Sequence, residues 1–231
     1  MLSFDGWFDF ATRMPGPPLK RYAQQNAIKG YVAHSAVGST QGVIDVVFGP
    51  AQKSVHGTID YQGNVIQFYS IHDSCWASGN EYVNTHFVAF ENEGGRTGPN
   101  DEFIEGVTNE LLTIPQIHIN AQIIIQLALA GWWLWPPVRP VSPFDLKATL
   151  WEHRELTRFG VAPTACPSNR IPWSLIMESV QDSSAQDLIP SIEKMLGALM
   201  EGGVMYKNGW NLKELDEKQK VLLEWFVKQL R

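Results

Sequence analysis

A histidine and a cysteine stand close together in the segment 151–173. His153 lies in a charged run, and Cys166 follows thirteen positions later in the run TACP. Neutral imidazole and thiolate are both good ligands for zinc. Their spacing matches none of the short structural zinc patterns, so any further ligand must come from a distant part of the sequence.

His34 is the strongest candidate for that third ligand. It ends the apolar run GYVAH and precedes a loop rich in glycine and serine. Three protein ligands would leave a fourth position open for water, which is the arrangement of catalytic zinc sites. The alternative is that His153 is a surface histidine and Cys166 a free thiol, since free cysteine is often buried as a small hydrophobe.

The composition is that of a globular protein. A length of 231 residues suits one generous domain, or a domain of about 150 residues with an appendage. The apolar fraction of 44% permits a sizeable core, and the formal charge of −6 argues against a nucleic-acid binder. The nine tryptophans fit either a large core or rings exposed for carbohydrate binding.

The two cysteines, Cys75 and Cys166, are too few for a disulfide framework. A single bridge between them would remove Cys166 from any metal, so the two interpretations compete. The N-terminal residues lack a basic start followed by an apolar stretch, so we expect no signal peptide and a chain made in the cytoplasm. Residues 122–135 are apolar but shorter than the roughly 20 residues of a membrane span, and we expect a core helix there.

The hydrophobic pattern predicts an α/β fold, with a mixed central β-sheet flanked by helices. Residues 1–27 are expected to be irregular because of the run PGPP, and segment 42–48 fits either a short strand or a helical turn. The predicted strands cover residues 28–35, 56–61, 64–69 and 85–91, with Gly63 in a hairpin turn and a loop over 72–76. The predicted helices cover residues 101–112 and 115–135.

The character of the chain changes after Trp173, and we expect residues 174–179 to close the domain. The polar run 181–186 resembles a linker, so we divide the chain into a domain of residues 1–179 and an appendage of residues 180–231. Segments 188–200 and 212–230 are amphipathic and predict a small C-terminal helical appendage. Its apolar stripe would pack on the main domain, form a helical hairpin or mediate self-association.

Several short motifs follow one another between residues 28 and 173. They are YVAHS at 31–35, SVHGTI at 54–59, GNVIQ at 63–67, WASG at 76–79, NTHFVAFENEG at 84–94, EHREL at 152–156, TACP at 164–167 and IPW at 171–173. In order and spacing the chain resembles the zinc-dependent type 2 N-acetylmuramoyl-L-alanine amidases. That family includes phage endolysin amidases, bacterial recycling amidases and animal peptidoglycan recognition proteins.

The resemblance implies a role for individual residues. One Zn²⁺ ion would be bound by His34, His153 and Cys166, and Glu91 stands at the position of the family's catalytic glutamate. Thr164 and His56 are candidates to hydrogen-bond the oxyanion or the substrate, although His56 fits equally well as a core histidine. Trp76 and Asn84 are candidates to line the cleft and bind substrate, although Trp76 fits equally well as a packing residue.

The chain departs from the family pattern at four positions. Ala77 replaces a histidine, Ser168 a glycine, Val55 a tyrosine of some phage members, and Thr164 a lysine of some members. These departures concern the secondary catalytic partners and leave the implied metal ligands in place.

The activity implied is hydrolysis of the amide between N-acetylmuramic acid and L-alanine in bacterial peptidoglycan. Without a signal peptide, a phage or prophage endolysin released through a holin-type pore is expected. One alternative is a non-catalytic peptidoglycan-binding module, which in some relatives lacks the third ligand. A second alternative is a zinc peptidase that acts on another stem-peptide bond or on a soluble muropeptide.

Overall fold

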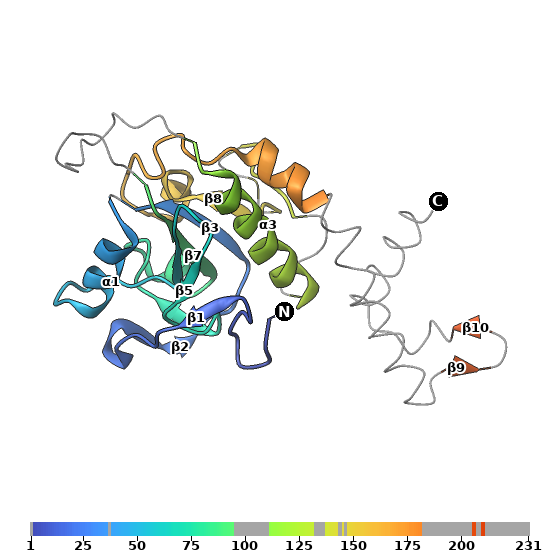
Figure 1. Ribbon diagram of the computed structural model, residues 1–231, viewed down its shortest axis with the longest axis horizontal. Helices are drawn as coiled ribbons and strands as arrows, with labels where there is room; N and C mark the ends of the chain where they lie inside the picture. The colour runs from blue at the N-terminus through green and yellow to red at the C-terminus, as the bar shows by residue number, and fades with distance from the viewer. Residues whose placement is uncertain are drawn as a thin grey trace.

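The computed structural model describes residues 2–36, 38–94, 111–131, 137–142, 145, 147–181, 205–206 and 209–210. At its centre lies a six-stranded mixed sheet with the strand order β1-β5-β4-β7-β3-β8 (Figure 1). The strands are β1 Ala11–Arg13, β3 Gly30–Ser35, β4 Gly57–Ile59, β5 Val65–Gln67, β7 Phe87–Asn92 and β8 Leu150–Glu152. Strand β3 pairs in parallel with both β7 and β8, whereas β4 and β5 form an antiparallel hairpin.

Helices lie on both sides of this sheet (Figure 1). Helix α3, Ile114–Leu129, covers one side beside the helical residues 173–181, and α1, Thr40–Phe48, lies on the other. The N-terminus of α3 is fixed by a capping box between Thr113 and Gln116. Smaller elements complete the fold: η1 Pro18–Lys20, β2 Arg21–Gln25, β6 Asp73–Cys75, α2 Glu81–Asn84, η2 His153–Phe159, β9 Met205–Tyr206 and β10 Gly209–Trp210.

Alternation along β3 divides its side chains between two cores. Tyr31 and Ala33 belong to the larger core beneath α3, whereas Val32 belongs to a second core with Trp151 and other apolar residues. Successive strand residues point to opposite faces. His34 therefore lies on the side of the sheet that faces away from α3.

The structure confirms the predicted mixed sheet flanked by helices. It also confirms the strand predicted over residues 28–35, which is β3. The predicted hairpin is formed by β4 and β5, and Gly63 in its turn has a φ of +82°. Segment 42–48, which fitted a strand or a helical turn, forms most of α1.

Two predictions of irregular structure were wrong. Residues 1–27 contain β1, η1 and β2, because β1 pairs with β5 and β2 pairs with β6. The expected loop over 72–76 contributes β6 to the second of these pairs. Strands β1, β2 and β6 are short, so their pairing partners rather than their own sequence patterns decide their structure.

Several predictions lie partly or wholly outside the described residues. Helix 115–135 is present as α3 up to Leu129, and residues 132–135 lie outside. Only 111–112 of the predicted helix 101–112 are described, and they are not helical. Of the appendage, the structure describes residues 180–181, which end the helical segment 173–181, and the antiparallel pair β9–β10. Its predicted helices and the division at residue 179 stay predictions. No helix in the described ranges is long and apolar enough to cross a membrane.

Candidate metal centre

His34 and Glu91 are direct neighbours on two parallel strands. The pairing of β3 with β7 sets the two residues opposite each other, so both side chains lie on the face away from α3. The Nδ1 atom of His34 lies 3.8 Å from Oε1 of Glu91. Strand pairing therefore places a carboxylate beside the first candidate ligand.

His153 comes from the strand on the other side of β3. It follows the end of β8, where the buried carboxylate of Glu152 accepts a hydrogen bond from Nε1 of Trp173 at 2.8 Å. The next residue, Arg154, donates its backbone N–H to the carbonyl of Cys166 at 2.9 Å. These contacts fasten the two ligand-bearing segments to each other.

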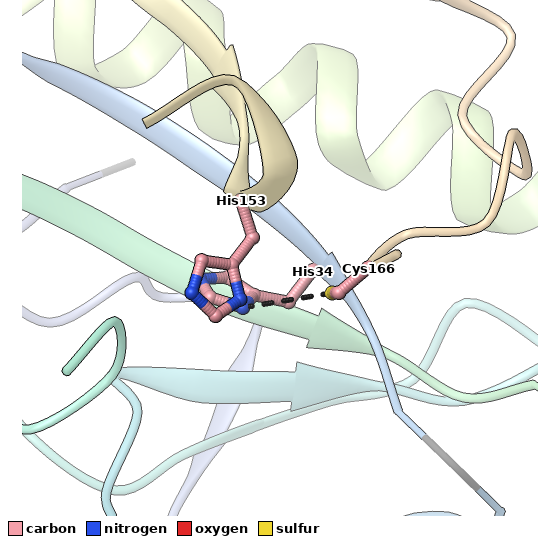
Figure 2. A group of neighbouring side chains, drawn as sticks. All are labelled: His34, His153 and Cys166. Carbon is pink, nitrogen blue, oxygen red and sulfur yellow. Dashed lines mark hydrogen bonds between the residues drawn. The ribbon is translucent and has the colours of Figure 1, made fainter. Parts of the chain in front are cut away.

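The three candidate ligands converge, as Figure 2 shows. Their ligand atoms all lie within 4.8 Å of one another. The Nδ1 atom of His34 lies 3.9 Å from Sγ of Cys166, and the rings of His34 and His153 lie 4.6 Å apart between centroids. Donors around one zinc ion are separated by about 3.5 Å, given bond lengths of about 2.0 to 2.3 Å. Small side-chain adjustments would therefore bring all three onto one ion.

The electrostatics of these side chains fit a cation as well. Burial lowers the pKa of His34 and of His153, which favours the neutral rings that keep a lone pair for a metal. Burial and the nearby carboxylate of Glu91 raise the pKa of the Cys166 thiol. Nε2 of His34 is buried without a hydrogen-bond partner. Two imidazoles and one thiol match the donor set of a catalytic zinc site.

Both cysteines are free thiols. Cys75 is fully buried, and Cys166 is half-buried beside His34. The competing interpretation of a disulfide between them is therefore wrong, and Cys166 is available as a ligand.

Glu91 carries an unsatisfied carboxylate oxygen. Its Oε2 is buried and has no hydrogen-bond partner. Burial raises the pKa of Glu91 to about 7, with a smaller opposing effect from the positive charge of Lys53. A carboxylate with a pKa near neutrality can both accept and release a proton under physiological conditions.

A cavity of about 740 Å³ opens over these residues. The structure brings seven of the eight residues singled out in the sequence to its wall: His34, Trp76, Asn84, Glu91, His153, Thr164 and Cys166. A volume of this size suits a ligand of several hundred daltons.

His56 is the exception. It is fully buried and does not line the cavity. Its Nε2 lies 2.9 Å from the carbonyl of Asp73, and its Nδ1 accepts the backbone N–H of Ala89 at 3.1 Å. Both ring nitrogens are thus occupied by backbone groups, which favours the core histidine over the catalytic alternative.

Thr164 and Asn84 reach the cavity in different ways. Oγ1 of Thr164 accepts the backbone N–H of Cys166 at 3.2 Å, which leaves the hydroxyl hydrogen available. The Asn84 amide is already engaged: Oδ1 accepts the N–H groups of Ala77 and Ser78 at 3.1 and 2.8 Å, and Nδ2 donates to Tyr22 at 3.3 Å. Asn84 therefore anchors the loop at the cavity wall.

That loop supports one of the candidate ligands. A backbone group of Ser78 hydrogen-bonds the ring of His153. Trp76, in the same loop, packs edge-on against Tyr22 with 6.0 Å between ring centroids and keeps part of its surface in the cavity. Partners of this kind fix the orientation of a ligating histidine.

Two residues of the site were missed by the sequence analysis. Arg170 is buried and donates to the Ser35 hydroxyl and, at 3.2 Å, to the carbonyl of Glu93, which ties the segment after Cys166 to the strand ends. Lys53 lines the cavity. Neither belongs to a motif, and only the tertiary structure brings them to the site.

Several solved structures share this fold. A selenomethionine derivative of AmpD aligns with a TM-score of 0.52 and 18% identity over 78% of this chain and 99% of AmpD. The hydrolase AmiA of Staphylococcus aureus aligns with a TM-score of 0.50 and 18% identity over 68% and 75%. The endolysin N-acetylmuramoyl-L-alanine amidase LysCS of Clostridium intestinale aligns with a TM-score of 0.48 and 13% identity over 76% and 98%. No protein-family model matches the chain, and no curated protein matches it.

The first two alignments confirm the resemblance at the level of the fold. The chain has the type 2 amidase fold, with a histidine–histidine–cysteine cluster at the ends of its central strands.

Proposed function

We propose that this chain is a zinc-dependent hydrolase of bacterial peptidoglycan that cleaves the amide between N-acetylmuramic acid and L-alanine. One observation carries the proposal: three metal-ligating side chains and an unsatisfied carboxylate meet in a single cavity. The type 2 amidase fold and the order of the sequence motifs support it.

His34, His153 and Cys166 would hold the zinc ion. When bound there, the ion would lower the pKa of a water molecule and polarise the carbonyl of the scissile amide. Glu91 would accept a proton from the attacking water and deliver it to the leaving amine nitrogen. The products are a free lactyl carboxylate on the sugar and a free amine on L-alanine.

Two further side chains act on the substrate in this proposal. Thr164 donates its free hydroxyl hydrogen to the carbonyl oxygen as negative charge develops there. Trp76 offers an apolar surface to the bound substrate, while Asn84 holds the loop that carries it.

The test is digestion of purified peptidoglycan by the zinc-loaded protein, with and without a chelator, followed by mass analysis. Stem peptides with a free L-alanine amine are expected, and the chelator should prevent their release. New amines within the stem peptide would instead establish a peptidase. Binding without any new amine would establish a recognition module and overturn the proposal.

The biological setting rests on sequence alone. The endolysin role, release through a holin-type pore and self-association through the C-terminal helices stay predictions. Lysis by the chain when it is coexpressed with a holin, but not without one, would support the first two.

A further inference from the structure

Lys53 supplies a positive charge to the wall of the cavity. Among the described residues that line it, Lys53 is the one lysine or arginine and Glu91 is the one carboxylate. No carboxylate in the described part of the chain forms an ion pair with Lys53. Lys53 therefore adds a positive charge to the cavity that acts electrostatically on Glu91 but is not held in an ion pair.

The proposed substrate carries a carboxylate that the ammonium group of Lys53 could bind. The lactyl carboxyl of N-acetylmuramic acid is consumed in the scissile amide, so the sugar side carries no carboxylate. The stem peptide, by contrast, carries the free α-carboxylate of D-glutamate one residue beyond L-alanine. A positive charge on the cavity wall thus fits the peptide side of the bond.

The surroundings of Lys53 agree with a peptide. The cavity wall also includes Val43 and Val46 of α1, apolar side chains of the kind that contact an alanine methyl group. The backbone N–H of Lys53 is bonded to the carbonyl of Ala51 at 2.9 Å, which fixes the turn from which the side chain extends.

We propose that Lys53 is a specificity-determining residue that binds the α-carboxylate of the second stem-peptide residue. The inference rests on the proposed amidase function and deepens it. The enzyme then prefers stem peptides with a free carboxylate over those in which this group is amidated.

The test compares two soluble substrates, N-acetylmuramoyl-L-alanyl-D-glutamate and N-acetylmuramoyl-L-alanyl-D-isoglutamine. The zinc-loaded full chain is expected to cleave the acid with a kcat/KM about tenfold higher than the amide. Lys53→Met should reduce this ratio to about one, and Lys53→Arg should keep most of it. Lys147→Met, which removes an exposed lysine away from the cavity, should leave the ratio as in the parent chain.

Each outcome is informative. Equal cleavage of both substrates by the parent chain would overturn the assignment. So would a Lys53→Met variant that shifts the pH profile and slows both substrates equally, because Lys53 would then act only through the charge of Glu91. If the parent chain cleaves neither these substrates nor peptidoglycan, the amidase function itself fails, and the assignment fails with it.

Discussion

At the ends of β3 and β7, the buried polar groups on the two faces of the central sheet differ in their hydrogen bonding. Behind the sheet, beneath α3, Asn92 donates to the carbonyl of His34 at 3.0 Å, and Asn120 donates to Asn92 at 2.7 Å. Tyr31 completes this network by donating to Asn120 at 2.6 Å. On the cavity face, Nε2 of His34 and Oε2 of Glu91 have no partner.

We interpret the hydrogen-bonded groups under α3 as stabilising the fold and the unsatisfied groups in the cavity as serving the proposed reaction. An unsatisfied buried polar group costs about 1–3 kcal/mol, so most proteins satisfy such groups. The network of Tyr31, Asn92 and Asn120 follows that rule and fixes the strand ends in place, although Oε1 of Gln126 in α3 has no partner. The cavity side breaks it at the residues proposed to hold a metal and move a proton, where local rules are expected to fail.

The largest effect is expected from removal of a ligand. Cys166→Ala or His153→Ala should abolish zinc binding and hydrolysis together, because two donors do not make a catalytic site. Metal content and peptidoglycan digestion, measured on the same sample, check this. Circular dichroism that matches the parent chain serves as the control, and full activity without bound zinc would contradict the site.

Replacement of Glu91 should separate binding from chemistry. Glu91→Gln keeps the shape of the side chain but cannot accept the proton, so activity should fall by about 10²- to 10⁴-fold with zinc retained. Metal analysis and initial rates measure the two effects. A Glu91→Gln variant with full activity would rule out the proton-transfer role.

On the α3 face the opposite pattern is expected. Asn120→Ala removes the acceptor of the Tyr31 hydroxyl and the donor to Oδ1 of Asn92, and it should lower the free energy of unfolding by about 3 kcal/mol. Zinc stoichiometry should be unchanged. Urea unfolding of this variant beside Gln41→Ala, an exposed change worth less than about 0.5 kcal/mol, measures the effect. Loss of zinc with unaltered stability would show that the two faces are not separable.

The smallest effect concerns His56 and pH. Burial lowers its pKa from 6.5 to about 4 in the folded chain. Between these values the unfolded chain binds a proton that the folded chain does not, so stability falls as the pH drops. The share of His56 between pH 7 and pH 5 is about 2 kcal/mol.

Urea unfolding of the metal-free protein at both pH values measures this share as the difference between the parent chain and His56→Gln. The other buried histidines contribute to both proteins and cancel. If the pH dependence of the two proteins is the same, His56 is not a neutral core residue.

The sequence predicted the fold class and the residues that gather in the cavity, because the motifs preserve both residue type and spacing. It could not separate His56 from the site, since the groups that occupy its ring come from Asp73 and Ala89, distant in the chain. Lys53 was not singled out because it belongs to no motif, and only the tertiary structure brings it to the cavity wall. Residues 1–27 were misjudged because their strands depend on partners around residues 65–75.

The register of β3 and β7 has a consequence for how this chain can change in length. His34 faces Glu91 only because the two strands are in phase. Insertion of one residue into either strand would bring a neighbour opposite and turn one of the pair into the core beneath α3. An insertion in a connecting loop leaves that phase intact. Natural variation in the length of such chains should therefore gather in the loops and spare these two strands.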